Sequence, residues 1–225
     1  DGLLIRQLIT AFALAASLME GAMDKGMPQL DIGGQIFLVN RQNVISQEYV
    51  PRTVVVDVSG QGRYMREDAA RALEEMFAAA KREANITLLT VSGYRSYSKQ
   101  STLYSNKIKS TGSVKKAQEY VAPPGASEHQ LGLAMDIGAK GVSTGLNGSF
   151  GKTKAGKWVR DNAHRFGFII RYQQGWEEIT GYNYEPWHVR YVGVEHATAM
   201  YEQNVSMETY MQSLQVKAIL DILEP

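Results

Sequence analysis

Cysteine is missing from all 225 residues of the sequence. This absence excludes a disulfide framework, and it means that any metal site has to be built from histidine, aspartate and glutamate. Histidine is scarce as well, with four in the whole chain. Few side chains are therefore available as nitrogen ligands, and the surroundings of each histidine decide whether a metal site is plausible.

An excess of charge of either sign is also missing. Lys and Arg number 24 and Asp and Glu number 23, which gives a net charge of +1. A protein built around nucleic acid carries a basic excess, which this chain does not have. A long run of like charge would indicate a charge-driven membrane or polyanion partner, and the sequence contains no such run. With 44% hydrophobic and 21% charged residues, the composition is that of an ordinary globular protein, and we expect no nucleic-acid partner.

A long hydrophobic run is the third absence. The apolar segment 9–19 is about half the ~20 residues that a membrane-spanning helix needs. Apolar residues recur around it at helical spacing, namely Leu4, Leu8, Phe12, Ala15 and Met19. We therefore expect an amphipathic helical arm over residues 1–30, followed by one domain over residues 31–225.

The rest of the chain interleaves short strands and helices without a regular βαβ rhythm. Apolar and β-branched runs predict strands at 36–41, 53–58, 86–91, 131–137, 168–172 and 187–193. Helical patterns are found at 66–85, from Ser98 to 108, at 157–167 and in the tail from Val194. This order predicts an α+β fold with a small, mainly antiparallel sheet flanked by helices.

One predicted strand carries an acid in apolar surroundings, in the segment "EHQLGLAMDI". In an extended chain, alternate residues from Leu131 to Ile137 form an apolar face, and Asp136 lies on the opposite face among small residues. An ionised aspartate in such a place needs a partner. His129 has the wrong parity to share the face of Asp136. It can meet the acid only if it precedes the regular strand or follows a bend.

A second segment, "YNYEPWHVRYVG", adds an acid and a histidine three residues apart. Pro186 excludes a helix interior, so Glu185 lies where a strand begins. Together the two segments offer His129, Asp136 and His188 as ligands and leave Glu185 as a free acid. A catalytic zinc site uses three protein ligands and an open position for water, and a nearby carboxylate can act as its general base. Each segment by itself is also compatible with a metal-free domain.

A third segment, "SGYRSYSKQ", delivers Arg95 from the end of a predicted strand. A guanidinium group can hold a carboxylate or a developing oxyanion by two parallel hydrogen bonds, and an ordinary surface ion pair is the alternative. Ser127 and Gln100 are candidates for substrate contact. Several aromatic residues near these segments can line a cleft, and Tyr94 and Trp187 are the candidates that we select.

The segments "GYRSYSKQ", "PGASEHQLGLAMDI" and "GYNYEPWHVRYVG", in this order, resemble the VanY-type D-alanyl-D-alanine carboxypeptidases. These zinc peptidases are related to L,D-carboxypeptidases, to D-Ala-D-Ala dipeptidases and to the hedgehog fold. The family pattern S-x-H-x-x-G-x-A-x-D is matched from Ser127 to Asp136, and E-x-W-H from Glu185 to His188. The resemblance extends over roughly residues 36–211.

The resemblance implies that His129, Asp136 and His188 hold Zn²⁺, that Glu185 is the general base, and that Arg95 orients the substrate or stabilises the transition state. The implied reaction is a D,D-carboxypeptidase cut that removes the C-terminal D-alanine from a peptidoglycan stem peptide. This substrate implies an extracytoplasmic protein, at the cell wall or surface of a bacterium and either secreted or membrane-anchored. No protein partner is evident.

Related activities remain open, because the residues around the metal are shared by L,D-carboxypeptidases that act on tetrapeptide stems and by D-Ala-D-Ala dipeptidases. The pocket walls differ between these enzymes, and the segments 109–125 and 143–156 are long enough to form a lid. A non-catalytic, zinc-containing wall-binding module is the alternative of another class. A free acid at Glu185 argues against it, since a binder has little use for one. His164 and His196 are interpreted as structural.

Overall fold

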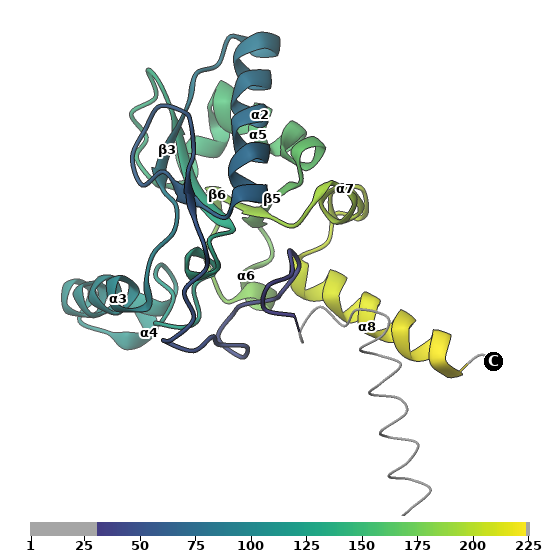
Figure 1. Cartoon of the computed structure of the whole chain (residues 1–225). Helices are drawn as coiled ribbons and strands as arrows, with labels where there is room; N and C mark the ends of the chain where they lie inside the picture. The colour runs from purple at the N-terminus through teal and green to yellow at the C-terminus, as the bar shows by residue number, and fades with distance from the viewer. Residues whose placement is uncertain (1–30, 224–225) are drawn as a thin grey trace, which may run out of the picture. The chain divides into compact units, whose positions relative to one another are not determined.

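The computed structural model describes residues 31–223 (Figure 1). The helical arm expected over residues 1–30 lies outside this range. The chain separates into two compact units, of which the larger comprises Val39–Met207. The smaller unit combines the N-terminal segment up to Leu38 with the C-terminal segment from Glu208, and it contains most of helix α8 (Met207–Leu223). All of the predicted site residues belong to the larger unit.

An antiparallel sheet of four strands forms the centre of the larger unit, with the order β3-β4-β6-β5. The strands are β3 (Leu88–Ser92), β4 (Ala134–Ala139), β5 (Phe168–Tyr172) and β6 (Glu185–Tyr191). Two very short strands, β1 (Val54–Val55) and β2 (Tyr64–Met65), pair separately as an antiparallel ribbon. This architecture confirms the predicted α+β class with a small, mainly antiparallel sheet.

Helix α2 (Glu67–Ala84) confirms the helix predicted over residues 66–85. Its apolar face is buried through Ala69, Ala70, Leu73, Met76, Phe77, Ala79 and Ala80. Acidic residues in the first turn and basic residues in the last turn complement the helix dipole. The helix ends at Asn85, whose left-handed backbone (φ 53°) directs its N–H to the carbonyls of Ala80 and Lys81.

The larger unit contains five further helices and three 3₁₀ turns. They are α3 (Tyr97–Thr111), α4 (Val114–Gln118), α5 (Lys154–Asn162), α6 (Glu177–Thr180) and α7 (Val194–Gln203), with 3₁₀ turns η2 (Glu128–Leu131), η3 (Gly148–Lys152) and η4 (Ala163–Phe166). Helices α3 and α4 pack against each other, apart from α2 and α5 in Figure 1. The connections around α4 and η3 correspond to the two excursions predicted at 109–125 and 143–156.

Several local predictions differ from the structure. Residues 36–41 form no strand but an irregular segment that bends at Asn40, where the side-chain carbonyl of Asn40 accepts hydrogen bonds from the backbone N–H groups of Gln42 and Asn43. The strand predicted at 53–58 shrinks to the two residues of β1. The helix predicted from Ser98 begins one residue earlier, at Tyr97 of α3, because the Ser96 hydroxyl caps it by accepting the N–H of Lys99 at 3.2 Å.

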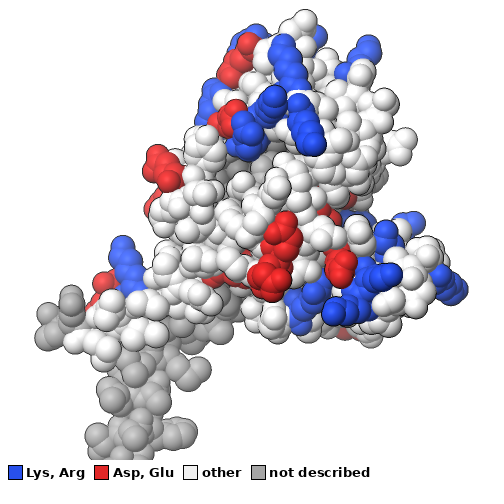
Figure 2. Space-filling model, turned by 180° about the vertical axis from the view of Figure 1, so that it is seen from behind, with Lys and Arg blue, Asp and Glu red and all other residues white. Residues whose placement is uncertain are grey.

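Charges of both signs alternate on the molecular surface, as the near-zero net charge leads one to expect. On the face shown in Figure 2, acidic side chains lie between groups of Lys and Arg. Among the helices formed by residues 31–223, none combines the length and the apolar character required to span a bilayer.

Leu73 provides a test of the packing between α2 and the rest of the larger unit, because its side chain is completely buried. Replacing Leu73 with Ala removes buried methyl groups and leaves a cavity, so we expect the free energy of unfolding to fall by about 2–5 kcal/mol. Urea denaturation monitored by circular dichroism measures this loss. The control is Glu75→Ala on the exposed side of the same helix, where we expect a change within about 0.5 kcal/mol.

Candidate active site

A 3₁₀ turn places His129 in front of strand β4. The turn η2 ends at Gly132, which adopts a left-handed conformation (φ 72°), and the strand begins only at Ala134. The strand predicted from residue 131 therefore starts later, because the positive φ at Gly132 bends the chain. The sequence required His129 to lie before the regular strand in order to meet Asp136. It does so, and the bend lets its ring face Asp136.

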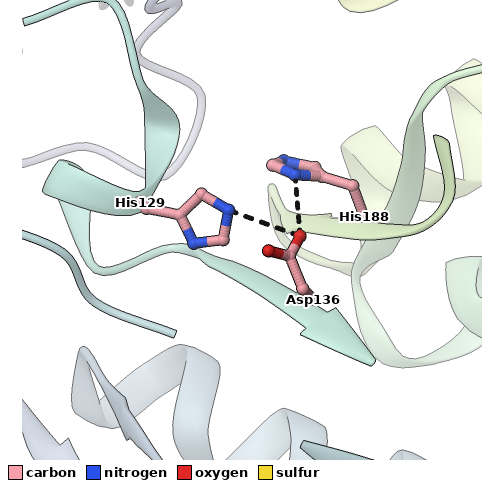
Figure 3. Close-up of side chains that lie close together, drawn as sticks. All are labelled: His129, Asp136 and His188. Carbon is pink, nitrogen blue, oxygen red and sulfur yellow. Dashed lines mark ion pairs between the residues drawn. The ribbon is translucent and has the colours of Figure 1, made fainter. Parts of the chain in front are cut away.

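Asp136 and His188 meet across the centre of the sheet. They are direct partners in the antiparallel pairing of β4 with β6. The Oδ1 atom of Asp136 lies 3.2 Å from Nδ1 of His188 and 3.4 Å from Nε2 of His129. Figure 3 shows one nitrogen of each ring directed at this same oxygen. The three side chains are buried, and their ligand atoms lie within 4.8 Å of one another.

The free atoms of this cluster match the needs of a zinc ion. Within residues 31–223, Nε2 of His129 and Oδ1 of Asp136 are buried without a hydrogen-bond partner, which is costly unless another group satisfies them. The other ring nitrogen of His129, Nδ1, is 2.8 Å from the carbonyl oxygen of Gly93. A carbonyl only accepts, so Nδ1 donates and the lone pair of Nε2 faces the cluster. Two nitrogens and one oxygen with an open side are a catalytic zinc ligand set.

A buried carboxylate lies behind His188 and was missed by sequence reasoning. Oε2 of Glu128 lies 3.2 Å from Nε2 of His188, and Oε1 accepts hydrogen bonds from Arg171 and Arg190 at 2.7 and 2.8 Å. Burial by itself would raise the pKa of Glu128, but the two arginines and His188 hold it well below its usual range. The sequence did carry a sign of this buried acid, because the apolar strand segments "FIIRY" and "WHVRY" each contain an arginine that needs an acidic partner.

Glu185 begins strand β6 and faces the same cluster. Its Oε2 atom is 3.8 Å from Nδ1 of His188, and in the antiparallel register it lies opposite Tyr172 on β5. In the metal-free protein, burial raises the pKa of Glu185 to about 7, against the lowering effect of His188. A carboxyl group with a pKa near neutrality is suited to take up and return a proton.

Arg95 is fixed beside the cluster by several contacts. Its backbone N–H bonds to the carbonyl of His129 at 3.1 Å, and its Nη2 atom lies 3.5 Å from Oδ2 of Asp136. Its Nη1 atom donates to Oε1 of Gln100 at 3.1 Å, while Nε2 of Gln100 donates to the carbonyl of Ala122 at 2.7 Å. Both ends of the Gln100 amide are thus engaged, so the structure places this residue as a support for Arg95. Substrate contact by Gln100 stays a prediction.

A cavity of about 360 Å³ opens over these residues. It brings together Arg95, Gln100, Ser127, His129, Asp136, Glu185, Trp187 and His188. One wall consists of Tyr120, Val121 and Ala122 with Lys107 of α3, and another of Leu146, Asn147 and Gly148, so both excursions contribute. Sequence reasoning did not single out Lys107 or Tyr172. Tyr94 is not brought to this cavity and lines a separate hollow with Tyr49, Tyr97 and neighbouring residues.

The two histidines interpreted as structural lie in α7 and η4, outside this cavity. The ring of His164 stacks on Tyr201 with centroids 3.9 Å apart. His196 lies in α7 and does not line the cavity. Of the four histidines, the structure therefore brings two, His129 and His188, to the candidate metal centre.

Comparison with known proteins agrees with this geometry. A family model described as VanY, D-alanyl-D-alanine carboxypeptidase, matches residues 62–194. The protein YodJ of Bacillus subtilis is 46% identical over 184 residues, which cover 79% of this chain and 67% of YodJ. The matched region spans about two thirds of the length of the first curated relatives.

Solved structures share the fold as well. The structure of the L,D-carboxypeptidase LdcB is 46% identical, with a TM-score of 0.74 over 79% of this chain and 86% of that chain. A VanY D,D-pentapeptidase variant in complex with Zn(II) is 37% identical, with a TM-score of 0.68 over 79% of this chain and 98% of that chain.

Fold, ligand cluster and comparisons together define a zinc-dependent metallopeptidase of the carboxypeptidase class. The chain belongs to the VanY family of D-alanyl-D-alanine carboxypeptidases.

Replacement of His188 by Ala tests the ligand set, because it removes one of the three converging ligand atoms. We expect the purified variant to lose stoichiometric zinc, measured by elemental analysis after dialysis. We also expect zinc to raise the melting temperature of the wild type and not that of the variant, since a ligand stabilises only the state that binds it. His164→Ala is the matched control, and full zinc content in the His188 variant would contradict the assignment.

Proposed function

We propose that the chain removes the C-terminal D-alanine from peptidoglycan stem peptides, and that its preferred cut is the L,D bond of tetrapeptide stems. The observation that carries the hydrolytic function is the position of Glu185, a free acid of raised pKa beside three converging metal ligands in one cavity. His129, Asp136 and His188 are the zinc ligands in this proposal, and Glu185 is the general base.

The preference for the L,D cut rests on similarity and on space. Identity is 46% with the L,D-carboxypeptidase LdcB and 37% with the D,D-pentapeptidase VanY, each over 79% of this chain. An L,D cut places the long side chain of a diamino acid next to the scissile bond, whereas a D,D cut places a methyl group there. A cavity of about 360 Å³ with walls from both excursions has room for the longer side chain. The D,D cut of pentapeptide stems is the second candidate, supported by the likeness to VanY.

The residues divide the chemistry among them. His129, Asp136 and His188 would hold a zinc ion, which when bound would supply Lewis-acid chemistry and lower the pKa of the attacking water to about 7. Glu185 accepts the proton of the attacking water and returns it to the amine of the departing D-alanine. Arg95 places a permanent positive charge beside Asp136, where it can bind the terminal carboxylate or the oxyanion that develops on the scissile carbonyl. Ser127 and Trp187 line the same cavity and are proposed substrate contacts.

A non-catalytic wall-binding module is less well supported. Such a module requires the fold and the metal, but it does not require a largely buried acid 3.8 Å from a ligand nitrogen of His188. Burying a carboxyl group whose charge is not fully compensated is costly, and catalysis gives a reason for it. We further propose an extracytoplasmic location, because peptidoglycan stem peptides are presented at the cell wall.

Replacement of Glu185 by Gln separates catalysis from metal binding. The amide keeps the shape of the side chain but cannot accept the proton, so we expect turnover to fall by at least about 10²–10⁴-fold, with zinc content unchanged. Released D-alanine and elemental analysis measure the two quantities. Glu178→Gln, an exposed change on α6, is the control, and wild-type turnover in the Glu185 variant would refute the assignment of the base.

Defined stem peptides decide the bond that is cut. We expect mass spectrometry to show conversion of the tetrapeptide to the tripeptide, with loss of one D-alanine, and we expect a chelator to stop it. Faster loss of D-alanine from the pentapeptide would establish the D,D cut instead. Release of dipeptide or absence of any cleavage in the zinc-loaded protein would show that the proposed reaction is wrong.

A further inference from the structure

Glu128 occupies an unusual position, directly before one metal-binding candidate in the sequence and in contact with another in space. It is 1% exposed, and its partners Arg171 of β5 and Arg190 of β6 are 0% exposed. Both arginines donate to the same carboxylate oxygen, Oε1, at 2.7 and 2.8 Å. The other oxygen, Oε2, lies 3.2 Å from Nε2 of His188. One oxygen of the Glu128 carboxylate therefore binds two arginines of the sheet, and the other oxygen contacts a histidine of the metal cluster.

Stability alone is a poor explanation for this group of buried charges. Desolvation of buried ions offsets most of their attraction, and well-packed apolar side chains of similar size often give equal or greater stability. Arg171 and Arg190 lie in β5 and β6 at positions where an apolar residue could have continued the core. The contact with His188 distinguishes this carboxylate from an ordinary internal ion pair.

The hydrogen-bond chemistry of the group determines where the proton of His188 lies. Guanidinium nitrogens carry only donors and stay charged, so they require the carboxylate oxygens of Glu128 as acceptors. Oε2 is then an acceptor as well, and Nε2 of His188 has to carry the hydrogen. The other ring nitrogen, Nδ1, lies 3.2 Å from Oδ1 of Asp136 and faces the cluster in Figure 3. In the metal-free protein this carboxylate can hold a hydrogen on Nδ1 as well, so Nδ1 offers its lone pair only when a metal occupies the cluster.

We propose that Glu128 is a positioning residue of the zinc site, which fixes the tautomer and the ring orientation of His188, while Arg171 and Arg190 hold the Glu128 carboxylate in place. The inference deepens the proposed function, because it takes His188 as a zinc ligand. The two histidines then present different nitrogens, Nδ1 of His188 and Nε2 of His129. A backbone carbonyl orients His129, whereas a buried, charged side chain orients His188.

Glu128→Gln changes the proton arrangement without changing the shape of the side chain. The amide has one acceptor oxygen, and the two arginines both require it. The amide NH₂ group is left facing Nε2 of His188, which must then become an acceptor and transfer its hydrogen to Nδ1. In this tautomer the Nδ1 lone pair is no longer available to a metal. If the role of Glu128 were purely structural, the Glu128→Gln variant would be less stable than the wild type, and the tautomer of His188 would be unchanged.

The experiment uses the full chain, labelled with ¹⁵N-histidine and loaded with zinc. Long-range ¹H–¹⁵N spectra identify the tautomer of each histidine, and competition with a chromophoric chelator gives the zinc affinity. In the wild type we expect hydrogen on Nε2 of His188. In Glu128→Gln we expect the hydrogen on Nε2 to be lost and zinc affinity to be about 10- to 100-fold lower. Glu83→Gln is the matched control, because Glu83 also pairs with an arginine, Arg165, but lies outside the site.

Two outcomes overturn the proposal. One is hydrogen on Nδ1 of His188 in the zinc-loaded wild-type protein, which decides the question even if the Glu128 variant does not fold. The other is a folded Glu128→Gln protein with unchanged tautomer and unchanged zinc affinity. Neither readout depends on turnover. Zinc binding without release of D-alanine from any stem peptide would contradict the proposed function and leave this inference intact.

Discussion

The pairing of Asp136 with His188 across β4 and β6 is the constraint on which the site depends. In an antiparallel sheet, a shift of one residue in register would turn the partner side chain to the other face. The apolar residues of β4, buried on its opposite side, fix this register, since a slip would expose them. The core of the sheet thus holds two ligands in place, and only the third, His129, needs a separate device. The left-handed Gly132 at the end of η2 is that device.

Three carboxyl groups lie within one small site, and their surroundings give them different protonation behaviour. Asp136 lies between two imidazoles and near Arg95, and the histidines hold its pKa well below its usual range despite burial. Glu128 is kept ionised in the same way by Arg171 and Arg190. Glu185 has weaker compensation, and in the metal-free protein burial raises its pKa to about 7. Two acids are therefore held as anions and acceptors, and the third is able to exchange a proton near neutral pH.

Local sequence patterns predicted the features that depend on residues close together in the chain. The period of apolar residues located α2, and the ordered motifs brought forward His129, Asp136, Glu185 and His188, which the structure gathers in one cavity. Features that depend on distant parts of the chain were not predicted. The contact of Glu128 with two arginines joins residues 43 and 62 positions apart in the sequence. No local pattern identifies Glu128 as the partner of these arginines. An arginine inside an apolar strand does indicate that an acidic partner is required.

Specificity comes from a different part of the molecule than the metal cluster. The ligands and Glu185 lie on the sheet or on the turn attached to it, and these elements are largely buried. The cavity walls come instead from the connections around α4 and η3, where Tyr120 and Leu146 are largely exposed. Connections of this kind accept changes of length and composition without disturbing the core. One sheet with one metal centre can therefore carry an L,D or a D,D cut, because the choice depends on which side chain the walls admit next to the scissile bond.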